Sequence, residues 1–314
     1  MISQFDPAGR LRHLITLQGF ERGQIIDLLD RAEAFLRPAG ELPARNESLA
    51  GRTVANLFFE PSTRTRASFE LAARRLGADV LSLDVSTSSR AKGESLLDTI
   101  YTLQAMQCDV FVVRDAQAGV PEFIVGHVAP HVRVLNAGES HLNHPTQGLL
   151  DMLTIRRHKG RFDDLVVTII GDIHHSRVAR SAAHALAVLG VGELRLVAPE
   201  HLRPDARDFP GARIVDDVDL GIRDADVVMA LRIQKERMSE NSVPDPADYF
   251  RRFGLDPQRL RLARDDAIVM HPGPMNRNVE IAPDVADGKQ SVIEEQVTNG
   301  VAVRMAVMEA VIGA

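Results

Sequence analysis

A cluster of hydroxyl and guanidinium side chains, Ser62-Thr63-Arg64-Thr65-Arg66, separates a short apolar segment from an amphipathic one. The first turn of a helix usually carries Asp or Glu, because acidic groups offset the positive end of the helix dipole and its unpaired N–H groups. Two arginines at this place are unfavourable unless an external anion accepts hydrogen bonds from the amides and the side chains together. A phosphate group meets all of these donors, so the sequence predicts a phosphate-binding turn.

A plainer interpretation of the same residues needs no ligand. Ser62 would be an ordinary helix N-cap, and Glu60 would pair with the arginines on the surface. This interpretation leaves the absence of acidic residues from the first turn unexplained, and the anion site is therefore favoured.

The elements that position this turn are a strand and a helix. Residues 53–59 are apolar and end at Glu60-Pro61, and a proline cannot continue a central strand. The following segment has apolar residues at helical spacing before Gly77, namely Phe69, Ala72, Ala73 and Leu76. We expect a buried strand that leads directly into an amphipathic helix.

The same alternation of strands and helices recurs along the chain and predicts the class of fold. We expect an α/β protein of two domains, each a parallel sheet with helices on both faces, and an active site in the interdomain cleft. The first domain would span residues 1–145 and be completed by a C-terminal helix at about 295–314, and the second would span 146–294. After the first strand, further strands are expected in residues 79–85, 109–113 and 131–136 and in the segments DLVVTIIGD, ELRLVA, ARIV, ADVVMAL and DAIVM.

Composition excludes several classes of protein. The 314 residues are 45% hydrophobic and 25% charged, no apolar run reaches membrane-spanning length, and the N-terminus lacks the apolar core of a signal peptide. A net charge of -6 disfavours a nucleic-acid-binding or membrane-binding face. The single cysteine, Cys108, cannot form an internal disulfide. We therefore expect a cytoplasmic protein whose partners include no nucleic acid and no membrane.

The residues that follow the expected strands show which chemistry the site favours, because ligands of parallel sheets bind beyond the carboxyl ends of the strands. They are rich in Arg, His, Lys, Gln and hydroxyl groups and poor in carboxylates, in segments 61–66, 86–92, 144–147, 172–177, 232–237 and 271–277 and at Arg114. This set suits an anionic, carbonyl-bearing substrate better than hydrolysis by paired carboxylates. His141, His144, His174 and His175 match no metal-binding motif in their spacing. We therefore expect no metal and no cofactor.

Four motifs in this order, STRTR at 62–66, HPTQ at 144–147, RIQKER at 232–237 and HPGPMNR at 271–277, resemble those of the aspartate carbamoyltransferase catalytic chains. The resemblance covers nearly all of the chain. It implies transfer of the carbamoyl group of carbamoyl phosphate to the amino group of L-aspartate, an early step of pyrimidine biosynthesis, without a cofactor. The products would be N-carbamoyl-L-aspartate and phosphate.

The resemblance also assigns residues to carbamoyl phosphate. Those that bind it would be Ser62, Thr63, Arg64, Thr65, Ser88, Lys92, Arg114, His144 and Gln147, and the catalytic ones among them Arg64, Thr65, Lys92, Arg114 and His144. An imidazole or hydroxyl can support a carbonyl oxygen and an amide side chain can bind the NH2 group, which agrees with the roles of His144 and Gln147.

Two of these residues imply an oligomer. Ser88 and Lys92 match residues that reach the active site of a neighbouring subunit, so the resemblance implies a homotrimer with shared sites. Ser86 and Ser89 remain alternatives to Ser88. A larger assembly with regulatory or dihydroorotase-like chains is left open.

The second substrate would be bound by residues of the second domain together with Lys92. The resemblance assigns Arg177, Arg232, Gln234, Gly273 and Pro274 to aspartate, and two guanidinium groups suit a dicarboxylate. Some family members carry leucine where this chain has Gly273. The glycine favours a looser loop that contacts the ligand through its main chain.

Three alternatives remain. Ornithine carbamoyltransferase shares the first two motifs but must bind a cationic side chain, which the arginines would repel. A dinucleotide-binding oxidoreductase is disfavoured because Ile173 and Ser176 replace glycines of its fingerprint. A catalytically silent relative is disfavoured by the retention of the matched polar residues.

Overall fold

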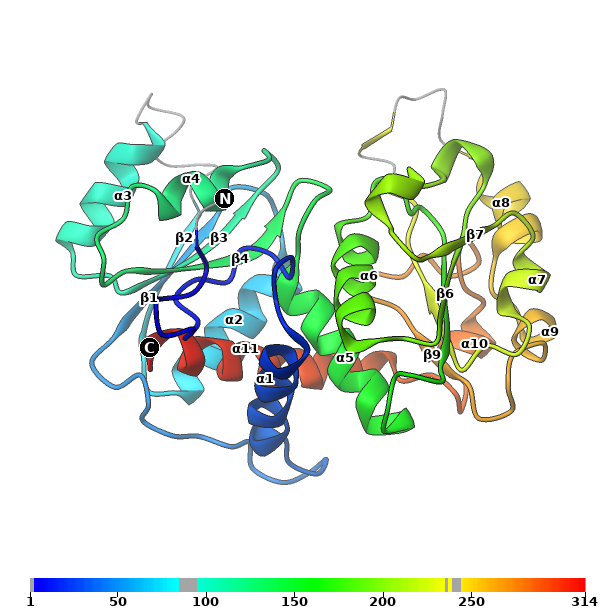
Figure 1. The fold of residues 1–314 in the computed structure, drawn as a ribbon, viewed down its shortest axis with the longest axis horizontal. Coiled ribbons are helices and arrows are strands. Elements are labelled where there is room, and N and C mark those ends of the chain that lie inside the picture. The colour runs from blue at the N-terminus through cyan, green and yellow to red at the C-terminus, as the bar shows by residue number, and fades with distance from the viewer. Residues whose placement is uncertain (1–2, 85–94, 235–236, 239–243, 314) are drawn as a thin grey trace. The chain divides into compact units, whose positions relative to one another are not determined.

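Two parallel β-sheets carry the fold (Figure 1). The computed structural model describes residues 3–84, 95–234, 237–238 and 244–313. The chain divides into two units, one formed by Met1–Leu153 with Thr298–Ala314 and the other by Thr154–Val297. Each unit contains one of the two sheets. Among the described residues, no helix is long and apolar enough to cross a membrane.

The sheet of the first unit has four strands in the order β2-β1-β3-β4, and all neighbouring strands are parallel. Its strands are β1 (Thr53–Phe58), β2 (Asp79–Asp84), β3 (Val110–Asp115) and β4 (Arg133–Glu139). The register pairs Phe58 with Arg114. The carboxyl ends of β1 and β3 therefore lie side by side, and the segment after β1 starts next to Arg114.

Helices cover both faces of this sheet (Figure 1). They are α1 (Arg22–Phe35), α2 (Thr63–Arg75), α3 (Leu96–Ala105), α4 (Val120–Val125), the start of α5 (Pro145–Lys159) and most of α11 (Ile293–Ile312). On the face covered by α3 and α4, alternate strand residues and helix residues form a continuous apolar core that includes Ala55, Leu57, Ile100, Leu103, Phe111, Val113 and Ile124. Helices α1, α2 and α11 lie on the opposite face. The alternation of side chains along each strand accounts for these two layers.

The sheet of the second unit has five strands in the order β7-β6-β5-β8-β9, again all parallel. They are β5 (Val166–Ile170), β6 (Glu193–Val197), β7 (Arg213–Val215), β8 (Val227–Ala230) and β9 (Ile268–Met270). Helix α6 (Arg177–Leu189) covers one face, and α7 (Val218–Ile222) and α8 (Pro246–Phe253) lie on the other (Figure 1). The strands β5, β8 and β9 are consecutive neighbours, so the segments that follow them start along one edge.

The predicted α/β class with two parallel, helix-covered sheets is confirmed. One local expectation is wrong: Arg114 does not follow its strand but lies within β3, which continues to Asp115. The reason is that pairing with β1 persists, since the Phe59 N–H donates to the Arg114 carbonyl at 2.8 Å. The prediction that the active site lies in a cleft between the domains stays a prediction.

Four short helices in the second unit were not expected. They are α7, α8, α9 (Pro257–Leu260) and α10 (Pro283–Ala286). None is long enough to show a clear apolar period. Two of them do carry a readable start signal, an aspartate N-cap followed by proline, at Asp245-Pro246 and Asp256-Pro257.

Candidate functional site

The turn between β1 and α2 presents donors at a helix start that lacks acid. Ser62 occupies the N-cap position, but its side chain makes no capping hydrogen bond. The interpretation of Ser62 as an ordinary side-chain cap is therefore wrong. Thr63 and Arg64 are exposed in the first turn, whereas Arg66 lies over the Phe58 ring at 5.3 Å from its centroid. The exposed donors face solvent at the positive end of a 13-residue helix, which suits an anion.

Arg114 lies beside this turn and is held by two neighbours. Its Nη2 is 2.6 Å from Glu60 Oε1, and its Nη1 donates to the Ala137 carbonyl at 3.1 Å. Both side chains of the ion pair are largely buried, with 12% of Arg114 and 18% of Glu60 exposed. Glu60 thus contacts the arginine of the adjacent strand, and Arg114 joins the segment after β1 to the ends of β3 and β4.

A buried network shapes the chain after β4. Asn136 and Glu139 are both buried, and Asn136 Nδ2 donates to Glu139 Oε2 at 3.0 Å and to the Ile15 carbonyl at 2.8 Å. The other carboxylate oxygen of Glu139 accepts from the Gly119 N–H. These bonds fix the turn that leads to His144, which is 4% exposed and whose carbonyl accepts the first helical hydrogen bond of α5, from the Gln147 N–H at 2.9 Å. Helix α5 begins at Pro145, directly after His144.

Gln147 belongs to a second buried network that reaches the C-terminal helix. Its Nε2 donates to Asp151 Oδ1 at 3.0 Å. Arg304 of α11 lies over the Phe69 ring of α2, with its guanidinium 4.9 Å from the ring centroid. Burial lowers the pKa of the Arg304 guanidinium to about 10, and the Asp151 carboxylate opposes this shift. The Asp151 carboxylate thus favours the charged form of Arg304 and accepts a hydrogen bond from the Gln147 amide.

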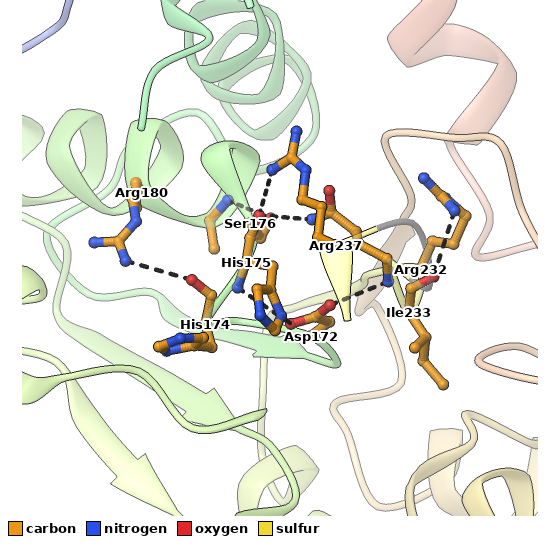
Figure 2. Close-up of polar contacts among 10 residues, drawn as sticks. Asp172, His174, His175, Ser176, Arg180, Arg232, Ile233 and Arg237 are labelled. Carbon is orange, nitrogen blue, oxygen red and sulfur yellow. Dashed lines mark hydrogen bonds and ion pairs between the residues drawn. The ribbon is translucent and has the colours of Figure 1, made fainter. Parts of the chain in front are cut away.

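In the second unit, Asp172 joins the segments that follow β5 and β8 (Figure 2). The residue is fully buried. Its Oδ1 accepts from the main-chain N–H of His175 at 3.2 Å and from His175 Nδ1 at 2.9 Å, and its Oδ2 accepts from the Gln234 N–H at 3.1 Å. The His175 carbonyl in turn accepts from Gln234 Nε2 at 2.9 Å and from Arg237 Nη1 at 2.7 Å. One carboxylate therefore sets the positions of two separate turns.

Close backbone packing makes this junction possible. Gly171 has a φ of 134°, and a Cβ atom there would collide with the Leu231 carbonyl. The Leu231 N–H donates to the Ile170 carbonyl at 2.7 Å. Glycine is required because only this residue combines such a φ with so close an approach. Arg177, at the start of α6, and Arg232, after β8, thus belong to turns that follow adjacent strands.

The segment 271–276 after β9 is held at both of its ends. The buried His271 accepts from the Gly273 N–H through Nδ1 at 2.8 Å, and its Nε2 lies 3.0 Å from Glu280 Oε1. The same carboxylate oxygen accepts from the Asn276 N–H. Gly273 has a φ of 65°, which favours glycine over leucine at this position. These bonds anchor the segment at both ends, and the expectation that it is looser than in relatives with leucine stays a prediction.

The structure thus brings the assigned residues into two sets, one in each unit. Ser62 to Thr65 follow β1, Arg114 lies at the end of the adjacent strand β3, and His144 and Gln147 lie at the start of α5. Arg177, Arg232 and Gln234 follow adjacent strands of the second sheet, and Gly273 and Pro274 follow the next strand. Ser88 and Lys92 lie outside the described residues.

The sequence did not single out two residues that organise the second set. Asp172 follows an apolar strand after a glycine, and this Gly-Asp pattern was a usable signal of a buried, hydrogen-bonded carboxylate. Glu280 carries no comparable signal. Its partners lie four and nine positions earlier and meet it only through the fold of the loop.

Comparison with known proteins gives matches to both units of the chain. Residues 12–157 match the family described as aspartate/ornithine carbamoyltransferase, carbamoyl-P binding domain, and residues 163–311 match its Asp/Orn binding domain. A solved structure of aspartate transcarbamoylase from Trypanosoma cruzi, in complex with carbamoyl aspartate and phosphate, is 32% identical with a TM-score of 0.86. That match covers 96% of this chain and 95% of the other.

Two further solved structures are similar over most of the chain. The Trypanosoma cruzi enzyme in complex with carbamoyl phosphate and aspartate is 32% identical with a TM-score of 0.82, over 96% of each chain. Ornithine carbamoyltransferase from Thermus thermophilus has a TM-score of 0.84 over 96% of this chain and 99% of the other, but at 24% identity this likeness concerns the fold alone. The two domain matches span most of the sequence, and the chain belongs to the aspartate/ornithine carbamoyltransferase family.

Proposed function

We propose that the chain transfers the carbamoyl group of carbamoyl phosphate to the amino group of L-aspartate. The observation that carries this choice is the order of chemical groups along one edge of the second sheet. Arg177 follows β5, Arg232 follows β8, and the loop containing Gly273 and Pro274 follows β9. Two guanidinium groups suit two carboxylates, and a loop rich in carbonyl acceptors suits an amine.

The donors of the first unit would bind carbamoyl phosphate. Ser62, Thr63, Arg64 and Thr65 lie at the start of α2, where the helix dipole and the hydroxyl and guanidinium donors favour a phosphate. His144 and Gln147 would bind the carbonyl oxygen and the amide of the carbamoyl group. The network of Gln147 with Asp151 orients this amide side chain.

The reaction would proceed by direct attack without a covalent enzyme intermediate. The neutral amine of aspartate attacks the carbamoyl carbon, and Thr65, Arg114 and His144 stabilise the resulting oxyanion. Phosphate then leaves onto the turn at 62–65 and takes up the proton that the amine loses. Catalysis would rest on orientation and electrostatic stabilisation, and loss of one oxyanion donor typically lowers kcat by about 10² to 10³.

Ornithine is the competing acceptor, because the family includes enzymes for both substrates. Ornithine has one carboxylate and a second amine, so one of the two arginines would face a cation. The retained arginines after β5 and β8 support aspartate as the substrate of this chain.

The deciding experiment measures phosphate release from carbamoyl phosphate by the purified chain, with L-aspartate and L-ornithine offered in parallel. We expect release with aspartate, and loss of this activity in Arg232→Ala with carbamoyl phosphate binding retained. Release with ornithine alone would overturn the assignment of the second unit but keep that of the first. Release with neither would contradict the proposed reaction.

We also propose that the enzyme acts in the cytoplasm as a homotrimer. In this trimer, Ser88 and Lys92 of each subunit would reach the active site of a neighbouring subunit. This proposal rests on the motif match of a segment outside the described residues and on the single cysteine of the chain. Sedimentation equilibrium should give the mass of three 34.5 kDa chains. A fully active monomer would contradict shared sites.

A further inference from the structure

The loop at 271–276 can offer a ligand hydrogen-bond acceptors but hardly any donors. Pro272 and Pro274 have no N–H group. The N–H of Gly273 is already used, since it donates to His271 Nδ1 at 2.8 Å. No residue in the described part of the chain donates to the carbonyls of Pro272, Gly273 or Pro274. The main chain between the two prolines therefore presents carbonyl oxygens alone.

The hydrogen bonds of His271 determine its tautomer. Because Nδ1 accepts from the Gly273 N–H, the ring proton must lie on Nε2. That Nε2 lies 3.0 Å from Glu280 Oε1 and donates to it. Both side chains are buried, with 0% of His271 and 2% of Glu280 exposed. The two hydrogen bonds together thus fix the tautomer in which Nδ1 accepts from Gly273 and Nε2 donates to Glu280.

Glu280 also holds the other end of the loop. The oxygen that accepts from His271 accepts from the Asn276 N–H as well. The main chain of His271 is fixed separately, because its N–H donates to Gln296 Oε1 of α11 at 2.9 Å. We call the set of Glu280, His271 and the N–H groups of Gly273 and Asn276 the Glu280 clamp.

We infer that Glu280 is a positioning residue for the amine substrate, which it serves through His271 and the clamped loop without touching the substrate. This inference rests on the proposed function and deepens it by assigning the recognition of the amino group. A buried carboxylate is costly, and an apolar contact could hold the chain at lower cost. An apolar contact could not occupy the N–H of Gly273, whereas the clamp does so and leaves only hydrogen-bond acceptors on the main chain between Pro272 and Pro274.

The experiment compares three variants with the wild-type enzyme. Glu280→Ala removes the clamp. Glu280→Gln keeps a side-chain oxygen that can accept from both His271 and Asn276. Asp266→Ala is a matched control, because Asp266 precedes the same strand β9 and pairs with Lys159 at 2.8 Å away from the clamp.

Steady-state kinetics separate positioning from general loosening. In Glu280→Ala we expect the KM for the amine substrate to rise about tenfold, the change that corresponds to about 1.4 kcal/mol, with the KM for carbamoyl phosphate unchanged. Glu280→Gln should restore the amine KM to within about threefold of the wild-type value, and Asp266→Ala should leave both KM values unchanged. An unchanged amine KM in Glu280→Ala, or an equal rise for both substrates, would overturn the inference.

A measurement without turnover tests the clamp itself. Nitrogen-15 NMR of His271 should show a protonated Nε2 and an unprotonated Nδ1. The amides of Gly273 and Asn276 should be protected from hydrogen exchange in the wild type and in Glu280→Gln. In Glu280→Ala this protection should be lost. Equal protection in all three would overturn the clamp. Absence of transfer by the wild-type enzyme would overturn the proposed function and this inference together, whereas transfer with an unchanged amine KM in Glu280→Ala overturns the inference alone.

Discussion

Asp172 illustrates how one residue can position several others. Its carboxylate accepts three hydrogen bonds, two from His175 and one from the main chain of Gln234, and it is fully buried. A buried carboxylate is tolerated when its oxygens are saturated in this way. The turns that carry Arg177 and Arg232 therefore depend on a residue that needs no contact with the ligand.

Replacement of Asp172 by asparagine should separate these two turns. The amide of asparagine has one acceptor oxygen, and its NH2 group would face an N–H donor that then stays unsatisfied. We expect the free energy of unfolding to fall by about 2 kcal/mol, and the KM for the amine substrate to rise. Urea titrations and steady-state kinetics would measure both effects.

The control is Asp163→Asn, which replaces an exposed carboxylate that precedes the same strand. Equal unfolding midpoints of the two variants would argue against the role of Asp172.

At this scale the sequence predicts residue types better than contacts. The arginines and hydroxyls of the first α2 turn were found because they are unusual at a helix start. The pairing of Arg114 with Glu60 was not predicted, because it depends on the register of β1 with β3. Contacts that join residues from different strands depend on strand order, which a single sequence does not contain.

At the scale of elements, parallel strands explain why the candidate residues gather. Each strand delivers the residue after it to the same edge, and the order β5-β8-β9 places three such segments in sequence. The long helices and the buried strands were predictable from their apolar patterns. The short helices α9 and α10 were not, because four residues are too few to show a period of 3.6.

The sequence pattern predicts that helix α11 is buried but does not predict the contacts of its polar residues. Its apolar character predicted a buried helix, and the first unit does include Thr298–Ala314. Its polar residues act at separate places: Arg304 stacks on Phe69, Gln296 accepts from the His271 N–H, and Glu309 accepts from Asn46. Such contacts between residues far apart in the chain have no signature in local periodicity.

At the scale of the whole molecule, a buried histidine links the stability of the fold to pH. His13 is 3% exposed, and its Nδ1 accepts from the Val134 N–H of β4 at 3.1 Å. Burial, together with the nearby guanidinium groups of Arg12 and Arg133, lowers the pKa of His13 from 6.5 to about 4. The N-terminal segment therefore packs on the first sheet with a neutral imidazole.

The sign of the pH effect is set by this depressed pKa. Between pH 6.5 and about 4 the unfolded chain binds a proton at His13 that the folded chain does not. The stabilisation is thus complete above pH 6.5 and is lost as the pH falls through this range, by up to about 3 kcal/mol.

The variant His13→Asn tests this effect, because its side-chain oxygen can accept from the Val134 N–H but the side chain cannot become charged. The difference in unfolding free energy between wild type and variant, from urea titrations at about pH 7, 5.5 and 4, should therefore shrink or reverse toward low pH. Carboxylates that titrate in the same range cancel in this difference, and a constant difference would show that His13 is protonated in the folded protein.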